Sequence, residues 1–216
     1  MIRMWSNPLY LVTDEELLAG KDLFETVEAA VKGGVSLVQL REKNSSTRDF
    51  IERAVRLKQI LAPYGVPLII NDRVDVALAS DADGVHIGQS DMPYPMVRRL
   101  LPSGKLIGLS VESPRQVLEA NQYEVDYIAA SPVFATATKT NTLTEWSIEG
   151  LRWIKSVSTH FLVGIGGIHV GNIASLFEAG ADGVAVVSAI IASSDPGKAA
   201  SSLLQALKKG EGHAKE

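Results

Sequence analysis

Three polar side chains at alternate positions give the first indication of chemistry in this sequence. Gln39, Arg41 and Lys43 end the apolar segment that begins at residue 35. Because successive side chains of a strand point to opposite faces, these three share one face, with an amide below two cations. Such a strand end could bind an anion as large as a diphosphate. The alternative interpretation is a solvated run of charges that opens a loop.

Two aspartates follow the next two apolar segments. Asp72 comes after residues 67–70 and Asp91 comes after residues 84–87. Magnesium is commonly held by one or two carboxylates together with substrate phosphates and water. Each aspartate could instead be the N-cap of the helix that follows it, because Asp is a favoured N-cap. Together, and beside a cationic strand end, the pair favours a Mg2+ site.

Hydroxyls, a lysine and glycines follow the later apolar segments. They are Ser110, the segment Thr136-Ala137-Thr138-Lys139, the pair Gly166-Gly167, and Val187-Ser188. Glycines let backbone N–H groups approach an anion closely, which predicts a phosphate site at Gly167 and Ser188. A turn that needs positive φ would also require glycine, and residues 136–139 could be a plain flexible loop.

Several kinds of catalytic site are excluded by composition. The chain has no cysteine, which rules out disulfides, thiolate zinc sites and a cysteine nucleophile. We find no Ser-His-Asp motif, Walker loop or zinc motif. His86 is the one histidine expected near the polar strand ends, and we interpret it as a structural residue.

Eight short apolar segments rich in Val, Ile and Leu must position these side chains. They span residues 9–12, 35–40, 67–70, 84–87, 106–109, 126–130, 161–165 and 183–187. Segments of this kind are typical of parallel strands buried on both faces. Helical periodicity lies between them, at residues 22–32, 48–61, 74–79, 94–101, 114–122, 148–156, 170–179 and 196–208.

This alternation predicts a single (β/α)8 TIM barrel with its site at the carboxyl ends of the strands. A doubly wound open sheet is the alternative, but the GxGxxG motif typical of it is absent after residues 9–12. We expect one domain over residues 1–216, with a core at about 8–208 and a disordered tail at 209–216. A net charge of −4 and the lack of a long apolar run indicate a soluble cytoplasmic enzyme that binds neither nucleic acid nor membrane.

The predicted site has two parts that suit two different anions. Arg41, Lys43, Lys139 and a carboxylate-bound Mg2+ suit a diphosphate, and the backbone near Gly167 and Ser188 suits a monophosphate. The simplest chemistry that uses both joins a diphosphate-activated electrophile to a phosphorylated nucleophile. A nucleophile with its own lone pair needs no general base.

Several motifs, in order from about residue 8 to 208, resemble those of thiamine-phosphate synthase. They are LYLVTD at 9–14, QLREK at 39–43, INDR at 70–73, GVHIGQ at 84–89, PVF at 132–134, TATK at 136–139, GIGGI at 164–168 and VSAI at 187–190. The resemblance implies a transferase that condenses 4-amino-2-methyl-5-pyrimidinylmethyl diphosphate with thiazole ethyl phosphate, or its carboxylated form. The products are thiamine phosphate and pyrophosphate.

The resemblance also implies a role for each matching residue. Asp72 and Asp91 hold Mg2+, the cofactor. The pyrimidine diphosphate is bound by Gln39, Leu40, Arg41, Glu42, Lys43, Asn71, Ser110 and Lys139, among which Arg41, Lys43, Ser110 and Lys139 serve catalysis. The thiazole phosphate is bound by Thr136, Ala137, Thr138, Gly167, Val187 and Ser188. The diphosphate leaves first, and the thiazole nitrogen captures the resulting cation.

Three other functions remain possible on the same barrel. Another phosphate-handling isomerase would normally need an acid/base pair, for which His86 is the one obvious histidine. A thiazole tautomerase handles a single phosphate, so the metal pair and the cation cluster would be surplus. A non-catalytic regulator that binds thiazole phosphate would be expected to have lost its diphosphate-binding groups. The partners are small phosphorylated molecules in each case, and the sequence leaves open whether the chain forms a homo-oligomer.

Overall fold

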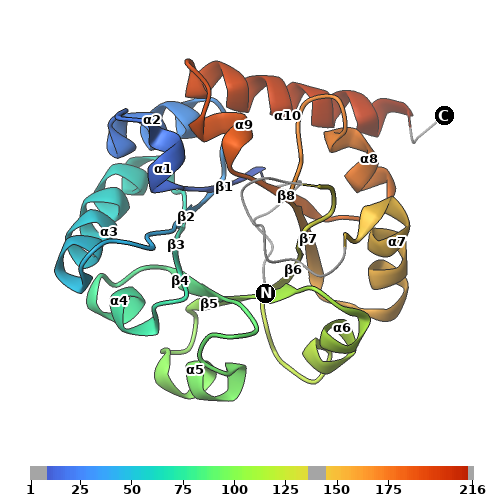
Figure 1. Ribbon diagram of the computed structural model, residues 1–216, viewed down its shortest axis with the longest axis horizontal. Coiled ribbons are helices and arrows are strands. Elements are labelled where there is room, and N and C mark those ends of the chain that lie inside the picture. Colours follow the sequence, from blue (N-terminus) through green and yellow to red (C-terminus); the bar gives the residue numbers. More distant parts are fainter. Residues whose placement is uncertain (1–8, 136–144, 214–216) are drawn as a thin grey trace.

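The computed structural model describes residues 9–135 and 145–213, with side chains up to residue 207. Eight parallel strands pair in chain order and close into a barrel, β1 against β8 (Figure 1). The strands are β1 Leu9–Val12, β2 Leu37–Leu40, β3 Leu68–Asn71, β4 Gly84–Ile87, β5 Leu106–Val111, β6 Tyr127–Ala130, β7 Phe161–Ile165 and β8 Gly183–Val186. The TIM-barrel prediction is confirmed, and the open-sheet alternative is excluded because each of these eight strands has a partner on both sides.

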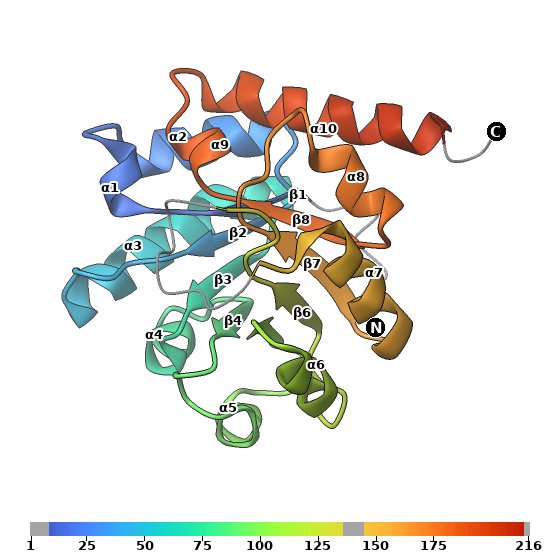
Figure 2. The ribbon, with the colours of Figure 1, turned by 45° about the vertical axis from the view of Figure 1, so that its right-hand side comes forward.

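Helices surround the barrel on its outside (Figures 1 and 2). They are α1 Glu15–Leu18, α2 Leu23–Lys32, α3 Thr47–Leu61, α4 Val74–Ala79, α5 Tyr94–Leu100, α6 Pro114–Ala120, α7 Ser147–Val157, α8 Ile173–Glu178, α9 Ser188–Ile191 and α10 Pro196–His213, with a short 3-10 helix η1 at Ala62–Tyr64. Helix α10 packs against α2 and α8 and continues to His213, into the tail expected at residues 209–216. No helix in the described ranges is both long and apolar enough to span a membrane.

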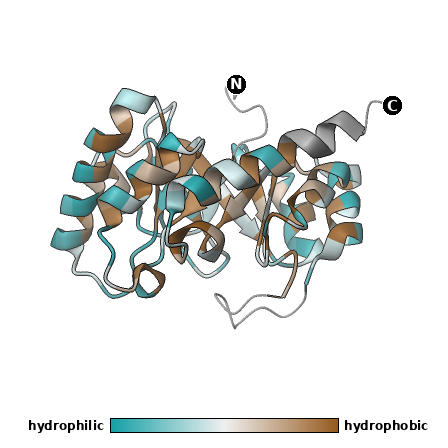
Figure 3. Ribbon diagram, turned by 90° about the horizontal axis from the view of Figure 1, so that it is seen from above, coloured by the Kyte–Doolittle hydropathy of each residue, from teal (hydrophilic) through white to brown (hydrophobic). Residues whose placement is uncertain are grey.

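The hydrophobic core has two layers, one on each face of the barrel wall. The outer layer lies between strands and helices, and hydrophobic and hydrophilic segments alternate along those helices (Figure 3). The inner layer fills the barrel and includes Tyr10, Leu37, Ile69, Tyr127 and Val163. Strands buried on both faces explain why the sequence shows continuous apolar runs.

An aspartate joins three pairs of neighbouring strands at their amino-terminal ends. Asp83, Asp126 and Asp182 each precede an even-numbered strand, and a carboxylate oxygen of each accepts a hydrogen bond from a backbone N–H of the preceding strand, at 2.8, 2.8 and 2.7 Å. The backbone N–H of each aspartate donates to the carbonyl of that same neighbouring residue. The Ala-Asp-Gly-Val sequence that recurs at 82–85 and 181–184 therefore marks a two-way clamp between strands.

We predict that Asp126→Ala lowers the free energy of unfolding by about 1.5–3 kcal/mol, because the N–H of Ile107 loses a charged acceptor. Chemical denaturation measures this change. Asp126→Asn keeps an acceptor oxygen and should cost less. Both variants should keep the activity of the folded enzyme, because the clamp lies at the end of the barrel remote from the site. Equal costs for the two variants would contradict the role of the hydrogen bond.

Candidate functional site

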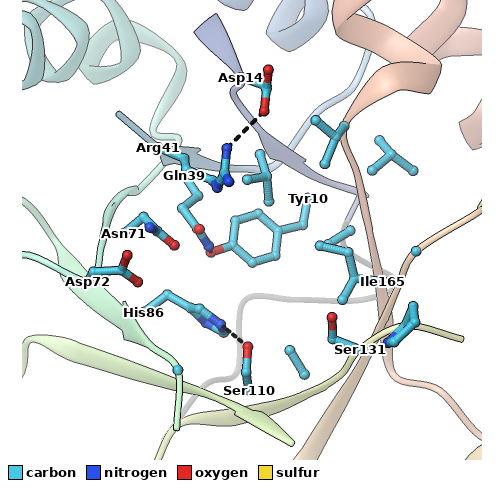
Figure 4. Close-up of a pocket in the computed structure, with 18 of the residues that line it drawn as sticks. Tyr10, Asp14, Gln39, Arg41, Asn71, Asp72, His86, Ser110, Ser131 and Ile165 are labelled. Carbon is cyan, nitrogen blue, oxygen red and sulfur yellow. Dashed lines mark hydrogen bonds and ion pairs between the residues drawn. The ribbon is translucent and has the colours of Figure 1, made fainter. Parts of the chain in front are cut away.

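A cavity of about 630 Å3 opens at the carboxyl ends of the strands. Its size is typical of a site for small molecules. Ten predicted site residues line it: Gln39, Arg41, Lys43, Asn71, Asp72, Asp91, Ser110, Gly167, Val187 and Ser188. Thr136, Ala137, Thr138 and Lys139 lie outside the described residues. The barrel thus brings together side chains that are far apart in the sequence (Figure 4).

The segment from Gln39 to Lys43 alternates as the sequence predicts. Gln39, Arg41 and Lys43 line the cavity. Leu40 belongs to the outer core and is fully buried, and the Glu42 side chain is only 1% exposed because it contacts Arg53. Any contact of Leu40 or Glu42 with a ligand would have to come from the backbone.

Aspartates hold both cations of this strand end. Arg41 Nη1 lies 2.8 Å from Asp14 Oδ2, and Lys43 Nζ lies 2.5 Å from Asp72 Oδ2 (Figure 4 shows the first pair). The Arg41 and Lys43 side chains are 30% and 49% exposed, so a ligand can reach them. The pairs hold two positive charges at one wall of the cavity.

Asp72 and Asp91 lie close enough to interact with one another. Burial raises the pKa of Asp91, and the hydrogen bond with Asp72 raises it further. Burial also acts to raise the pKa of Asp72, but the hydrogen bonds with Lys43 and Asp91 outweigh it and the pKa is lowered. Two half-buried carboxylates that interact in this way form a site that favours a cation.

The capping alternative for these aspartates is not what the structure shows. Arg73 and Pro93 occupy the N-cap positions of α4 and α5, and neither helix has a side-chain cap in the described structure. Asp91 instead accepts a hydrogen bond from the N–H of Gly88 at 2.7 Å. Asp72 has a φ of 62°, a conformation that costs energy for a residue with a Cβ.

A buried carboxylate pair supports the same strand end from behind. Arg53 contacts both Glu15 and Glu42, and Ser45 Oγ donates to Glu42 at 2.5 Å. Burial raises the pKa of Glu42, and the hydrogen bond with Glu15 raises it further. In Glu15, burial is outweighed by hydrogen bonds from Glu42, Ser45 and Arg53, which hold the pKa at about 2. The two carboxyl groups are therefore shifted in opposite directions, with the pKa of Glu42 raised and that of Glu15 lowered.

This pair orders the backbone that carries Lys43. Glu15 Oε2 accepts hydrogen bonds from the backbone N–H groups of Lys43 and Asn44, at 3.3 and 3.4 Å. The short helix α1, which the sequence analysis did not predict, supplies Glu15. Glu42 thus acts on the site through its neighbours.

The opposite wall of the cavity is formed by β7 and β8 and carries no charged group among its described residues. Gly166 and Gly167 have φ values of 105° and 65°, and a Cβ on Gly167 would collide with the backbone of Ala135. Both glycines are therefore required by the turn itself. Helix α9 begins at Ser188 on this wall, and no described side chain caps its first turn.

Sequence reasoning missed several polar residues of the cavity. Asp14, Tyr10 and Gln89 line it. His86 lies at the cavity, as expected from the sequence, and its Nε2 is 2.9 Å from Ser110 Oγ (Figure 4). Tyr10 occupies an inward position of β1, so the alternation rule could have found it. Asp14 gives no such signal, because its partner Arg41 comes from another strand.

Comparisons with known proteins agree with one another. Residues 9–190 match the family model described as thiamine monophosphate synthase. The chain is 54% identical over 204 residues to the thiamine-phosphate synthase of Albidiferax ferrireducens, covering 94% of this chain and 93% of that protein. It is 52% identical over 196 residues to that of Vibrio parahaemolyticus, covering 91% and 96%.

A solved structure shows the same arrangement. The thiamine phosphate pyrophosphorylase from Pyrococcus furiosus superposes with a TM-score of 0.86 at 36% identity, and the match covers 95% of this chain and 97% of that one.

We predict that Glu42→Gln has a higher free energy of unfolding than the natural protein, and that this difference grows as the pH rises from about 4 to 7. A raised pKa in the fold means that Glu42 stabilises the protein below the pKa of the unfolded chain, and that this stability is lost as the pH rises. The glutamine of the variant mimics the protonated carboxyl group, so its contribution to the free energy of unfolding does not change over this pH range. Urea denaturation at several pH values measures the difference.

The matched control is Glu52→Gln, at an exposed carboxylate of α3. It should show no comparable trend with pH. A difference between Glu42→Gln and the natural protein that stays constant from pH 4 to 7 would contradict the raised pKa of Glu42.

Proposed function

Because the chain belongs to the thiamine monophosphate synthase family, we propose that its cavity holds a pyrimidine diphosphate beside a thiazole phosphate and joins them into thiamine phosphate. Family membership makes the protein a transferase of thiamine biosynthesis. The observation that supports the proposal best is the division of the cavity. One wall carries Arg41 and Lys43 with the carboxylates of Asp14, Asp72 and Asp91, and the opposite wall, from Gly167 to Ser188, is uncharged where described.

The charged wall suits the diphosphate. Arg41 and Lys43 would neutralise its oxygens, leaving Asp14 and Asp72 as they do so. Asn71 and Ser110 line the cavity next to this wall, where they would contact the pyrimidine. Lys139 is proposed as a further diphosphate ligand on the strength of the resemblance alone.

Asp72 and Asp91 fit a magnesium ion. Within the described ranges no three His, Cys, Asp or Glu side chains gather into a metal cluster, so the protein would supply two carboxylates. That number is usual for Mg2+ bound together with substrate phosphates and water. Burial and the hydrogen bond with Asp72 disfavour the charged form of Asp91 and raise its pKa, and a bound cation would favour that charged form. A bound Mg2+ would stabilise negative charge on the departing diphosphate.

The uncharged wall suits the thiazole phosphate. Gly167, Val187 and Ser188 would offer backbone N–H groups and a hydroxyl to a single phosphate. Thr136, Ala137 and Thr138 complete this site in the resemblance. Two walls of different charge explain how one cavity keeps the two phosphorylated substrates apart at their anionic ends and brings them together at their rings.

The proposed reaction needs little proton transfer. The bond between the pyrimidine methylene carbon and the diphosphate oxygen breaks, and its electron pair leaves with pyrophosphate. The lone pair of the thiazole nitrogen then forms the new carbon–nitrogen bond. Arg41 and Lys43 stabilise the charge that develops on the leaving group. A tautomerase expels no diphosphate and would not need this wall.

The direct test measures pyrophosphate release from the pyrimidine diphosphate, with and without thiazole phosphate and Mg2+. We expect rapid release only with both, and a product with the mass of thiamine phosphate. Release of no pyrophosphate, with thiazole phosphate still bound, would overturn the proposal in favour of a tautomerase or regulator.

We predict that Asp72→Asn lowers kcat at least about 10²-fold, because it weakens charge stabilisation at the leaving group. Asparagine tolerates the positive φ of this position, so the fold should be preserved. Excess Mg2+ should recover part of the activity. The affinity for thiazole phosphate, measured by calorimetry, should stay within about twofold, since its site lies on the opposite wall.

The opposite phenotype is expected from Ser188→Asp, which places a negative charge on the uncharged wall and should weaken thiazole phosphate binding. Ser194→Asp makes the same change at an exposed position beyond α9 and should have no effect.

If Asp72→Asn retains full kcat at saturating substrates, the metal assignment is wrong.

A further inference from the structure

Five side chains from five different strands form a hydrogen-bonded chain across the floor of the cavity. Gln39 Nε2 donates to the Tyr10 hydroxyl at 2.6 Å, and that hydroxyl lies 2.8 Å from the hydroxyl of Tyr127. His86 Nδ1 lies 3.0 Å from the Tyr127 hydroxyl, and His86 Nε2 lies 2.9 Å from Ser110 Oγ. We call Gln39, Tyr10, Tyr127, His86 and Ser110 the floor chain; Figure 4 labels four of them.

The chemistry of these groups gives the floor chain a direction. An amide nitrogen can only donate, so the Tyr10 hydroxyl accepts from Gln39. Tyr10 is 2% exposed, and its own hydrogen finds an acceptor in the Tyr127 oxygen. If Tyr127 donated to Tyr10 instead, the buried Tyr10 hydrogen would have no acceptor among the described residues, which is costly.

The direction continues to the cavity. With its oxygen accepting from Tyr10, the Tyr127 hydroxyl can donate its hydrogen to His86 Nδ1, 3.0 Å away. In that tautomer the histidine carries its hydrogen on Nε2 and donates it to Ser110 Oγ, 2.9 Å away. The Ser110 oxygen accepts this hydrogen bond from His86 on the floor side, so the hydroxyl hydrogen of Ser110 points toward the ligand. Burial raises the pKa of both tyrosines, which therefore keep their protons.

A glycine in the strand between them makes the contact of Tyr127 with His86 possible. In the barrel register Gly108 of β5 pairs with His86 of β4 on one side and with Tyr127 of β6 on the other. A Cβ on Gly108 would collide with the Tyr127 ring and with His86 Nδ1. The two rings stack over this gap, with centroids 5.5 Å apart and planes at 23°. Residues from the three neighbouring strands β4, β5 and β6 thus fit together to form the Tyr127–His86 contact of the floor chain.

We propose that Tyr10, Tyr127 and His86 are positioning residues that fix Ser110 as a hydrogen-bond donor toward a ring nitrogen of the pyrimidine. The proposal rests on the function proposed above. A ring nitrogen of an aminopyrimidine has a lone pair and accepts hydrogen bonds, so a serine whose hydrogen points to the ligand favours it. A benzene-like ring or a protonated nitrogen would leave the Ser110 hydrogen without a partner.

The hydrogen position on His86 is the first test, and it needs no substrate. Nitrogen-15 NMR of the whole, unliganded enzyme separates the two neutral forms of a histidine ring. We expect Nε2–H in the natural protein and a mixture of both forms in Tyr127→Phe. An Nδ1–H form in the natural protein would overturn the direction of the floor chain, whatever reaction the enzyme catalyses.

The second test follows the effect to Ser110. Tyr127→Phe keeps the buried ring and removes one hydroxyl, and it should raise KM for the pyrimidine diphosphate about 5- to 10-fold, as for one lost hydrogen bond. KM for thiazole phosphate should not change. Tyr123→Phe is the matched control, because Tyr123 stacks on Tyr94 away from the cavity.

The double variant separates positioning from a structural role. If Tyr127 acts through Ser110, then Tyr127→Phe should add little to the rise in KM that Ser110→Ala alone produces. Additive effects, or a loss of thermal stability with no change in KM, would overturn the proposal. Failure of the proposed function would appear differently, as no pyrophosphate release by the natural enzyme.

Discussion

Closure of the barrel is the constraint on which the rest of this structure depends. Eight parallel strands in a ring direct alternate side chains into one narrow interior, where a polar group can be satisfied only by another polar group from a different strand. Apolar residues such as Leu37, Ile69 and Val163 fill most of that space. The hydroxyls of Tyr10 and Tyr127 form a hydrogen bond inside the barrel, at the depth where polar groups begin.

The same closure brings opposite charges together at the cavity. Arg41 and Lys43 come from the end of β2, and their partners Asp14 and Asp72 follow β1 and β3, its two neighbours in the ring. Two cations at one strand end would repel one another if each lacked a counterion. With an aspartate beside each of them, the two cations are paired before any ligand arrives, and a diphosphate can take over their contacts.

Local rules predicted the parts of the molecule that depend on local sequence. The strand β4 and helix α4 have the predicted bounds, and the alternation of Gln39, Arg41 and Lys43 places all three in the cavity. Such features follow from periodicity, which a sequence displays directly.

What the sequence did not reveal depends on contacts between distant residues. The helices α1 and α9 have only four residues each, too few to show a period. Glu42 looks in the sequence like one more charge in a polar run, and only the folded structure shows that its side chain is buried against Arg53 and that burial and Glu15 raise its pKa. His86 looked structural because its two partners, Tyr127 and Ser110, lie on other strands. A histidine with both ring nitrogens engaged in this way can orient a neighbouring side chain. That arrangement suits a reaction whose nucleophile is a lone pair, since the chemistry then needs orientation and charge stabilisation more than it needs a base.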